Sequence, residues 1–508
     1  MTGSFDQRSR SLWMDIEVAH DARQLEGDQS CDTVVIGAGM AGISTAYELA
    51  KEGQTVIVLD RGAIAGGITA RTSAHLAPLC DDLTSAMIGL RGEDISRGFY
   101  ESQAAAVNRI EEIQNREDIA CDFRRLHGIL FQAPNTDAKI IDDELDAVRK
   151  VGAPVHRIVG VDALAGCEAQ HALRYPRQGT FHPLKYLKGL ARAIAAKDGR
   201  LFANTVVRAV EEQDNGTVTV KTDRGNITAN AAVVATNSPI VDVTALHTKM
   251  APYRTYALAF RTRRGILPDA LYWDTLDPYH YVRLQPGDRQ TDYVIVGGAD
   301  HKSGEADDAT VRFDALEAWA RNLIPKLGDV SHRWSGQVLD TIDYAAFIGR
   351  NPGSERVFVH TGDSGQGITH AVAGSLLNSA LILGKAARWA EVYDPARKTP
   401  SGIGNFVREN MTVVKNFAEY LAPGELSSLD ELKPGKGAIV RQGLAKVAAY
   451  RDDRGELYTR SAACTHLGCH LHWNSFERCW DCPCHGSHFA VEGTPLNAPA
   501  ISNLAELK

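Results

Sequence analysis

The 508-residue sequence has no stretch of the roughly 18 uninterrupted apolar residues that a bilayer-spanning helix needs. Residues 1–14 are mostly polar and lack the apolar core of a secretory signal peptide. No basic block occurs either, and 55 Lys and Arg against 63 Asp and Glu leave a formal net charge of −8. These absences argue against an integral membrane segment and a nucleic-acid partner, and they predict a cytoplasmic protein.

Cysteine is also scarce, with nine in the chain, but its placement is uneven. Five of the nine stand near the carboxyl end: Cys464, Cys469, Cys479, Cys482 and Cys484. Clustering of this kind favours a metal site over a disulfide scaffold. The rest of the composition, 44% hydrophobic and 23% charged, is typical of a globular protein, and the length suggests two or three folding units.

Strand-like and helical runs alternate over most of the chain, which predicts an α/β fold. We expect residues 1–30 to form an amino-terminal arm and residues 31–426 to form a Rossmann-like α/β domain with an interleaved α+β part. Residues 427–508 are predicted to form a small all-β domain. Before that domain we expect a long helix from Ile368 to about Trp389 and a short helical stretch that ends at Leu421.

A glycine turn near the amino terminus predicts a dinucleotide site. The apolar strand 32–36 runs directly into Gly37, Gly39 and Gly42, and the next strand ends at Asp60. In such a turn the second glycine lets the backbone approach a pyrophosphate, the third lets helix and strand pack closely, and the carboxylate accepts a ribose hydroxyl. The alternative is an ordinary tight turn with Asp60 as a solvated strand end. The motif alone leaves FAD and NAD open.

Four further segments carry a family resemblance: residues 66–75, 205–207, 347–349 and a second glycine cluster at 361–369. With them, residues 30–390 resemble the flavoenzyme family of D-amino acid, glycine and sarcosine oxidases. Because that family uses FAD, the resemblance implies that residues 31–426 form a Rossmann-like FAD-binding domain with an interleaved α+β substrate domain. The FAD would be held by Gly37, Gly39, Gly42, Asp60, Arg61, Gly67, Thr69, Arg71, Thr72, Ser73, Val207, Gly362, Gly365, Gln366, Gly367, Ile368 and Thr369. A helix that begins beside the second cluster would favour negative charge on the reduced flavin ring.

The cysteine-rich tail offers two thiolates and two imidazoles on two loops. Cys464 and His466 form a C-x-H pair, and Cys482 and His485 form a C-x2-H pair. This is the ligand set by which Rieske [2Fe-2S] centres replace two cysteines on one iron. Zinc also accepts two cysteines and two histidines, but zinc fingers usually place their first two ligands as a C-x2-4-C pair.

Residues 428–508 resemble Rieske proteins. The resemblance implies two ligand pairs, one for each iron: Cys464 with Cys482, and His466 with His485. It also implies a disulfide between Cys469 and Cys484 that joins the two loops. Cys479 matches no ligand position, and we expect it to be a buried thiol.

The two halves together indicate an electron relay, because a flavin takes two electrons as hydride whereas a Rieske cluster handles one at a time. We predict a dehydrogenase that oxidises the C–N bond of a small amine or amino acid and passes electrons from FAD through the cluster to an external one-electron carrier. One alternative is a reductase in which the Rieske domain feeds the flavin. The other is an oxygen-using oxidase with a redox-sensing cluster. The sequence leaves the direction of electron flow open.

The substrate side is predicted from an aromatic segment. If residues 279–283 form a strand, Tyr279, Tyr281 and Arg283 share one face, and two rings with a cation suit an amine that carries a carboxylate. The alternative is a packed strand with Arg283 in a salt bridge. His75 aligns near the flavin ring of the resembled family and is either a residue that orients substrate or shuttles a proton, or a structural histidine. Residues 334–337 show no counterpart of that family's arginine.

Overall fold

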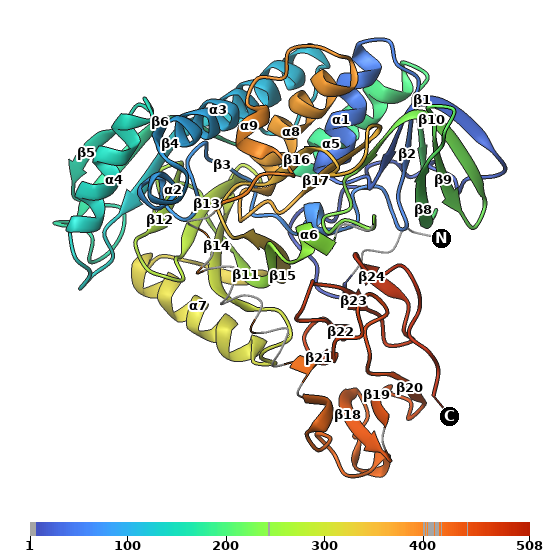
Figure 1. Ribbon diagram of the computed structural model, residues 1–508. Helices are drawn as coiled ribbons and strands as arrows, with labels where there is room; N and C mark the ends of the chain where they lie inside the picture. The colour runs from blue at the N-terminus through green and yellow to red at the C-terminus, as the bar shows by residue number, and fades with distance from the viewer. Residues whose placement is uncertain are drawn as a thin grey trace.

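Two large β-sheets form the main body, and two small sheets form a carboxy-terminal lobe beneath it (Figure 1). This computed structural model describes residues 7–241, 244–399, 402, 404, 411, 416–417, 419–443 and 445–507. The body and the lobe are built from segments that follow one another along the chain, and the first strand of the lobe begins at Lys436.

The first sheet has eight strands: β1 (Gln29–Ile36), β2 (Val56–Leu59), β7 (Arg200–Phe202), β8 (Val207–Glu212), β9 (Val218–Thr222), β10 (Gly225–Val234), β16 (Phe347–Arg350) and β17 (Val357–Thr361). They lie in the order β16-β17-β10-β1-β2-β7, and the pairs from β17 to β7 are parallel. The second half of β1 and all of β2 are buried and consist mainly of valine, isoleucine and leucine, which is typical of parallel strands covered on both faces.

Three helices pack on this sheet, α1 (Met40–Lys51), α5 (Pro183–Ala195) and α8 (Gly367–Ile382), and α3 (Glu93–Arg116) packs on α8. Helix α5 begins after His182, whose ring accepts a hydrogen bond from the backbone N–H of Lys185 at 3.3 Å. Helix α8 ends at Ile382, so the prediction of a helix reaching Trp389 was wrong. Gly384 has φ +64 there, and the Lys385 N–H donates to Ala380 O at 2.8 Å, which closes the helix.

The second sheet has nine strands: β3 (His75–Leu76), β4 (Arg124–Phe131), β5 (His156–Val159), β6 (His171–Thr180), β11 (Met250–Arg263), β12 (Ala270–Asp274), β13 (Tyr281–Pro286), β14 (Thr291–Lys302) and β15 (Asp329–Thr341). Its path is β15-β11-β14-β13-β12-β4-β6-β3, with β5 beside β6, and most pairs are antiparallel. Its strands come from segments that alternate along the chain with those of the first sheet. The interleaved α+β part is therefore confirmed.

The remaining helices are α2 (Thr84–Arg91), α4 (Lys139–Lys150), α6 (Thr244–His247), α7 (Ala309–Leu323), α9 (Ala390–Tyr393) and the short 3-10 turns η1 (Ile68–Arg71), η3 (Glu419–Leu421) and η4 (Leu429–Glu431). Helix α7 packs on β11 and β14 of the second sheet. Most of the predicted helical stretch before Leu421 lies outside the described residues. In the part of the chain that the structure describes, no helix is long and apolar enough to cross a membrane.

The carboxy-terminal lobe contains two small antiparallel sheets. One holds β18 (Lys436–Gln442), β19 (Ala445–Arg451) and β20 (Leu457–Ser461), and the other holds β21 (His472–Asn474), β22 (Cys479–Asp481), β23 (His488–Phe489) and β24 (Pro495–Asn497). The loops before β21 and after β22 carry the clustered cysteines and histidines. The predicted all-β lobe is confirmed.

Candidate functional site

A cavity of about 1010 Å³ is lined by both large sheets and by the carboxy-terminal lobe. Gly42 and Gly362 lie behind its wall, whereas the other residues predicted to hold FAD line it: Gly37, Gly39, Asp60, Arg61, Gly67, Thr69, Arg71, Thr72, Ser73, Val207, Gly365, Gln366, Gly367, Ile368 and Thr369. The structure therefore brings both glycine clusters to one cavity. The individual roles of these residues toward the cofactor stay predictions.

The turn between β1 and α1 has the backbone that the glycine motif requires. Gly37 has φ +99, and a Cβ there would lie 2.3 Å from Ala235 O. A Cβ on Gly42 would lie 1.8 Å from Gly37 O, so this glycine permits the close packing behind the wall. A Cβ on Gly39 would instead approach the Thr69 side chain, at 3.0 Å from its Oγ1, on the cavity side. The turn is a cradle with space for a pyrophosphate.

Strand β2 carries Asp60 to the cavity wall. Its Oδ2 accepts the Ala38 N–H at 2.7 Å and its Oδ1 accepts the Gly62 N–H at 2.9 Å. Burial raises the pKa of this carboxyl. A carboxylate offers about four lone-pair sites, so the two backbone bonds leave acceptor capacity for a ribose hydroxyl.

The second glycine cluster enters the cavity at the start of α8. Gly365 has φ +76, and a Cβ there would lie 1.9 Å from the Asp81 Oδ2, so only glycine fits between this carboxylate and the loop. The Gln366 side chain donates to Ala77 O at 3.0 Å. The first turn of α8 lines the cavity, and the partial positive charge of a helix amino terminus favours negative charge there. This environment fits a reduced flavin.

The cysteine-histidine loops of the lobe bring like ligands together. A hydrogen bond from the Cys482 thiol lowers the pKa of Cys464 and raises that of Cys482, so the two sulfurs are adjacent. The rings of His466 and His485 lie 5.1 Å apart. Burial lowers the pKa of His485 to about 3, which keeps the imidazole neutral, as metal binding requires. Two thiols and two imidazoles in separate pairs fit a Rieske cluster.

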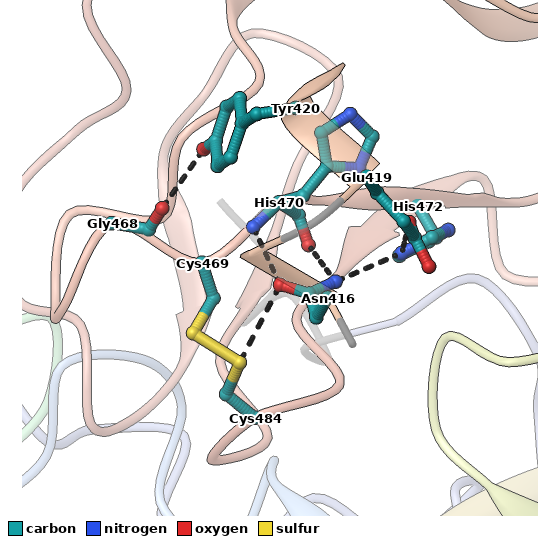
Figure 2. Close-up of a disulfide and its surroundings, with 8 residues drawn as sticks. All are labelled: Asn416, Glu419, Tyr420, Gly468, Cys469, His470, His472 and Cys484. Atoms are coloured by element: carbon teal, nitrogen blue, oxygen red, sulfur yellow. Dashed lines mark hydrogen bonds and ion pairs between the residues drawn. A yellow bond between two sulfur atoms is a disulfide. The ribbon is translucent and has the colours of Figure 1, made fainter. Parts of the chain in front are cut away.

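The expected disulfide between Cys469 and Cys484 forms and joins the two loops (Figure 2). The neighbouring segment supports it, because the Asn416 Nδ2 donates to His470 O at 3.1 Å and its Oδ1 accepts the His470 N–H at 2.8 Å. The Tyr420 hydroxyl donates to Gly468 O at 2.8 Å. The loops are thus held by one covalent bond and by hydrogen bonds with Asn416 and Tyr420.

The loop that carries His485 touches the cavity wall. Gln337 lines the cavity, and its Nε2 donates to Gly486 O at 2.9 Å. On the body side, the ring of His247 at the end of α6 lies 4.8 Å from the ring of His466 and 5.6 Å from that of His485. The histidine edge of the lobe therefore contacts the main body, with His485 buried and His466 half-buried.

Two buried ion pairs hold the lobe on the body. Arg254 of β11 lies 2.9 Å from the Asp481 carboxylate of β22, and Arg71 of η1 lies 3.4 Å from the Glu477 carboxylate. Glu477 also accepts the Ser9 N–H at 2.8 Å, so the amino-terminal segment joins the same contact. Buried charges need such partners, and these pairs fix the orientation of the lobe.

At the other end of the cavity lie three residues that the sequence predicts for the substrate side. Tyr279, Tyr281 and His75 all line the cavity, and the rings of His75 and Tyr281 lie 5.1 Å apart. The Tyr279 hydroxyl donates to the Asp81 Oδ2 at 2.7 Å. Burial lowers the pKa of His75 to about 3, so this ring is neutral near pH 7.

Arg283 does not line the cavity, in contrast to its predicted place beside the two tyrosines. The side chain is fully buried, and its Nη1 donates to the carbonyl oxygens of Ser73, Ala74 and Phe181. Its role as a cation for a substrate carboxylate is therefore corrected to a structural one. The physical reason is that the guanidinium binds the backbone oxygens of Ser73 and Ala74 and so lies behind the wall segment that carries Ser73 and His75.

Sequence reasoning missed two parts of the site. The first is a set of carboxylates that line the cavity: Asp81, Asp82, Asp277 and Asp300. The adjacent pair Asp81-Asp82, directly after an apolar run, was a signal in the sequence. The second is the lobe segment 492–503, part of which closes the cavity, with Arg61 Nη1 donating to Pro495 O at 2.7 Å. Nothing in a single sequence indicates this docking.

A two-sheet α/β body with a glycine cradle, joined to a lobe with paired thiols and imidazoles, defines a flavoprotein oxidoreductase with an iron-sulfur domain. Residues 32–380 match the model of the FAD dependent oxidoreductase family, and residues 424–508 match the Rieske [2Fe-2S] domain. The chain belongs to the FAD dependent oxidoreductase family and carries a carboxy-terminal Rieske domain. It is an FAD-dependent oxidoreductase of the amine and amino acid oxidase type.

Relatives support both halves. The chain is 29% identical over 490 residues to the Rieske 2Fe-2S iron-sulfur protein YhfW of Bacillus subtilis, covering 95% of this chain and 94% of that protein. It is 24% identical to gamma-glutamylputrescine oxidoreductase of Escherichia coli, over 71% of this chain and 85% of that protein. The body has the fold of glycine oxidase from Geobacillus kaustophilus, with a TM-score of 0.61 at 19% identity over 73% of this chain and 99% of that chain.

We expect purified protein to contain two iron and two acid-labile sulfide per chain and no zinc, and to show the Rieske electron paramagnetic resonance signal when the cluster is reduced. His466→Cys should lower the cluster potential or lose the cluster, because a charged thiolate replaces a neutral imidazole. Cys479→Ser is the control, since this buried thiol donates to Asp481 and is no predicted ligand. Zinc near one per chain without the signal would contradict the assignment.

Reduction of the Cys469–Cys484 disulfide is expected to destabilise the lobe by about 3 kcal/mol, because it opens a loop of 15 residues. Thermal unfolding of the lobe, followed by the visible circular dichroism of the cluster, should shift to lower temperature with a reductant that cleaves disulfides. A Cys469→Ser, Cys484→Ser variant should already unfold at the lower temperature and should not respond to that reductant. Identical unfolding of wild type in both buffers would refute the claim.

Proposed function

We propose that this protein is a dehydrogenase that oxidises the C–N bond of a small amine or amino acid and delivers the electrons, through FAD and the Rieske cluster, to an external one-electron carrier. The family supports oxidation at a C–N bond, because relatives named glycine oxidase, D-amino acid dehydrogenase and gamma-glutamylputrescine oxidoreductase match the body. The lobe supports a one-electron exit.

The observation that carries this proposal is the contact between the cluster loop and the cavity. Gln337 lines the cavity and binds the backbone next to His485, while His247 packs on both histidine rings. A redox-sensing lobe does not require its cluster loop to lie against the wall of the flavin cavity. A relay does, because electron transfer needs the two centres close together.

FAD held at the glycine cradle would supply a hydride acceptor for the substrate carbon while the nitrogen loses a proton, and the imine product would then hydrolyse. A Rieske cluster held by Cys464, Cys482, His466 and His485 would supply one-electron transfer. The residues of the chain prepare this chemistry. The amino end of α8 favours negative charge in the cavity. His75, neutral through burial, is available at the cavity wall as a hydrogen-bonding group for substrate. Tyr279 and Tyr281 line the cavity beside it.

An anaerobic screen of amines and amino acids tests the proposal, with flavin absorbance and the cluster signal recorded in the same sample. We expect at least one compound of these classes to bleach the flavin and reduce the cluster. Rapid reduction by a ferredoxin or a nicotinamide, with none by any amine or amino acid, would indicate the reductase direction. Flavin bleaching with an oxidised cluster, followed by fast reaction with oxygen, would indicate an oxidase.

A further inference from the structure

We infer that the substrate end of the cavity binds a positively charged amine that carries no carboxylate, with a diamine as the simplest member of the class. The inference rests on the proposed function, since it assumes that the C–N bond is oxidised in this cavity. It narrows the substrate from amines and amino acids in general to cations, and three independent features of the wall support it.

The first feature is the charge of the wall at this end. Asp81 and Asp82 follow β3, Asp277 lies between β12 and β13, and Asp300 lies on β14, and all four line the cavity. They are close enough for Asp300 to raise the pKa of Asp81, and for Asp81 and Asp277 to raise that of Asp82. Four carboxylates around one space favour a cationic occupant and disfavour a carboxylate.

The second feature is the position of the basic side chains in the cavity wall. Among the described residues that line the cavity, the arginines are Arg61, Arg71 and Arg208. Arg61 donates to Pro495 O, Arg208 pairs with Asp223 at 2.6 Å, and Arg71 faces Glu477 of the lobe. Each of these three arginines thus has a partner on the nucleotide side or the lobe side of the cavity. No lysine is found among the described lining residues, so the acidic end has no cation of its own to hold a substrate carboxylate.

The third feature is the remaining wall, which suits an ammonium group. Trp273, Tyr279 and Tyr281 present aromatic rings, whose faces attract cations. Gln366 also lines the cavity and is 8% exposed, and its Oε1 accepts no hydrogen bond from any described residue. A buried acceptor without a donor is costly, and an N–H group of the substrate would supply one.

Three compounds of equal chain length test the inference: 1,4-diaminobutane, butylamine and 4-aminobutanoate, which end in a positive, a neutral and a negative group. Anaerobic flavin reduction by the holoenzyme should follow that order, and calorimetry should give the tightest binding for the diamine. Asp81→Asn should weaken diamine binding about 10- to 100-fold while butylamine changes less, since a charged hydrogen bond is lost. Flavin content and circular dichroism show whether this isosteric variant folds, and Asp300→Asn is the second variant.

Asp314→Asn, an exposed change on α7, is the matched control and should leave all three affinities unchanged. A preference for 4-aminobutanoate would overturn the inference while leaving C–N oxidation intact. So would an Asp81→Asn variant that binds each of the three compounds as tightly as wild type does. Reduction of the flavin by none of them, but by a ferredoxin or nicotinamide, would instead refute the proposed function. The two failures are therefore distinguishable.

Diamine affinity should also rise with pH. Burial raises the pKa of Asp81 to about 7; Tyr279 and Asp300 are the polar groups that act on this carboxyl. Burial also raises the pKa of Asp82 to about 7, and the neighbouring carboxylates of Asp81 and Asp277 add to this effect. The pKa of Asp300 rises to about 6 for the same reason, with His280 and Arg312 nearby. Ionisation between about pH 6 and 7 creates the negative charge, so the diamine should bind more tightly at pH 8 than at pH 5.5. The opposite slope would contradict the inference.

Discussion

Replacing Gly39 with valine is expected to give a folded protein that contains no flavin. The backbone at Gly39 tolerates a side chain, because an added Cβ would approach only a threonine side chain, 3.0 Å from the Thr69 Oγ1. The valine methyl groups would however enter the cavity at the glycine cradle, where the pyrophosphate is predicted to lie. The ratio of flavin to protein absorbance measures the loss, and circular dichroism shows that the chain still folds.

Gly89→Val in α2 is the matched control, since an added Cβ there meets nothing within 4 Å and the residue is remote from the cavity wall. This variant should keep its flavin. Gly42→Ala should behave differently from both, because a Cβ at Gly42 would lie 1.8 Å from Gly37 O and would disturb the fold itself. Full flavin occupancy in Gly39→Val would show that the cofactor lies elsewhere.

Replacing Arg254 with methionine is expected to separate flavin reduction from cluster reduction. The change leaves the buried Asp481 carboxylate without its ion pair, at a cost of about 3–5 kcal/mol to the docked lobe. The flavin cavity keeps its glycine cradle and its substrate end. Substrate should therefore still bleach the flavin at the wild-type rate, while the following reduction of the cluster should slow by at least about tenfold, because each 1.4 kcal/mol is a factor of ten in the docked population.

Arg261→Met on the same strand is the control, because its partner Asp288 is exposed and such surface pairs contribute little. Rapid mixing with absorbance at flavin and cluster wavelengths follows both steps. Equal cluster reduction in Arg254→Met and wild type would show that the docking seen here does not serve electron transfer. A lower melting temperature in Arg254→Met alone would show that the ion pair contributes to stability.

Much of the fold and of the cofactor chemistry could be predicted from the sequence because it depends on local backbone rules. Gly37 needs φ +99, and Gly42 needs the absence of a Cβ, so their spacing alone indicates the turn. The ligand pattern of the cluster loops is similarly local, because a single residue separates Cys464 from His466. The buried thiol of Cys479 and the disulfide of Cys469 with Cys484 are confirmed. The domain boundary near residue 426 stays a prediction.

What could not be predicted depends on contacts between distant segments. Strand alternation alone cannot show that Arg283 turns to the carbonyls of Ser73 and Ala74, since those lie about 210 residues earlier in the chain. The end of α8 was missed because the capping geometry at Gly384 outweighs an apolar pattern that continues beyond it. Residues 334–337, where the resembled family has an arginine, include Gln337, which instead binds the lobe at Gly486.

The order in which the two centres are reduced tests the central claim most directly. Substrate identified in the anaerobic screen is mixed with the oxidised holoenzyme, and samples frozen at successive times are examined for flavin absorbance and for the Rieske paramagnetic signal. We predict that the flavin absorbance falls first and that the cluster signal then grows at a rate independent of protein concentration, as expected for transfer within one chain. Growth of the cluster signal before any change in the flavin, or at a rate proportional to protein concentration, would contradict the account.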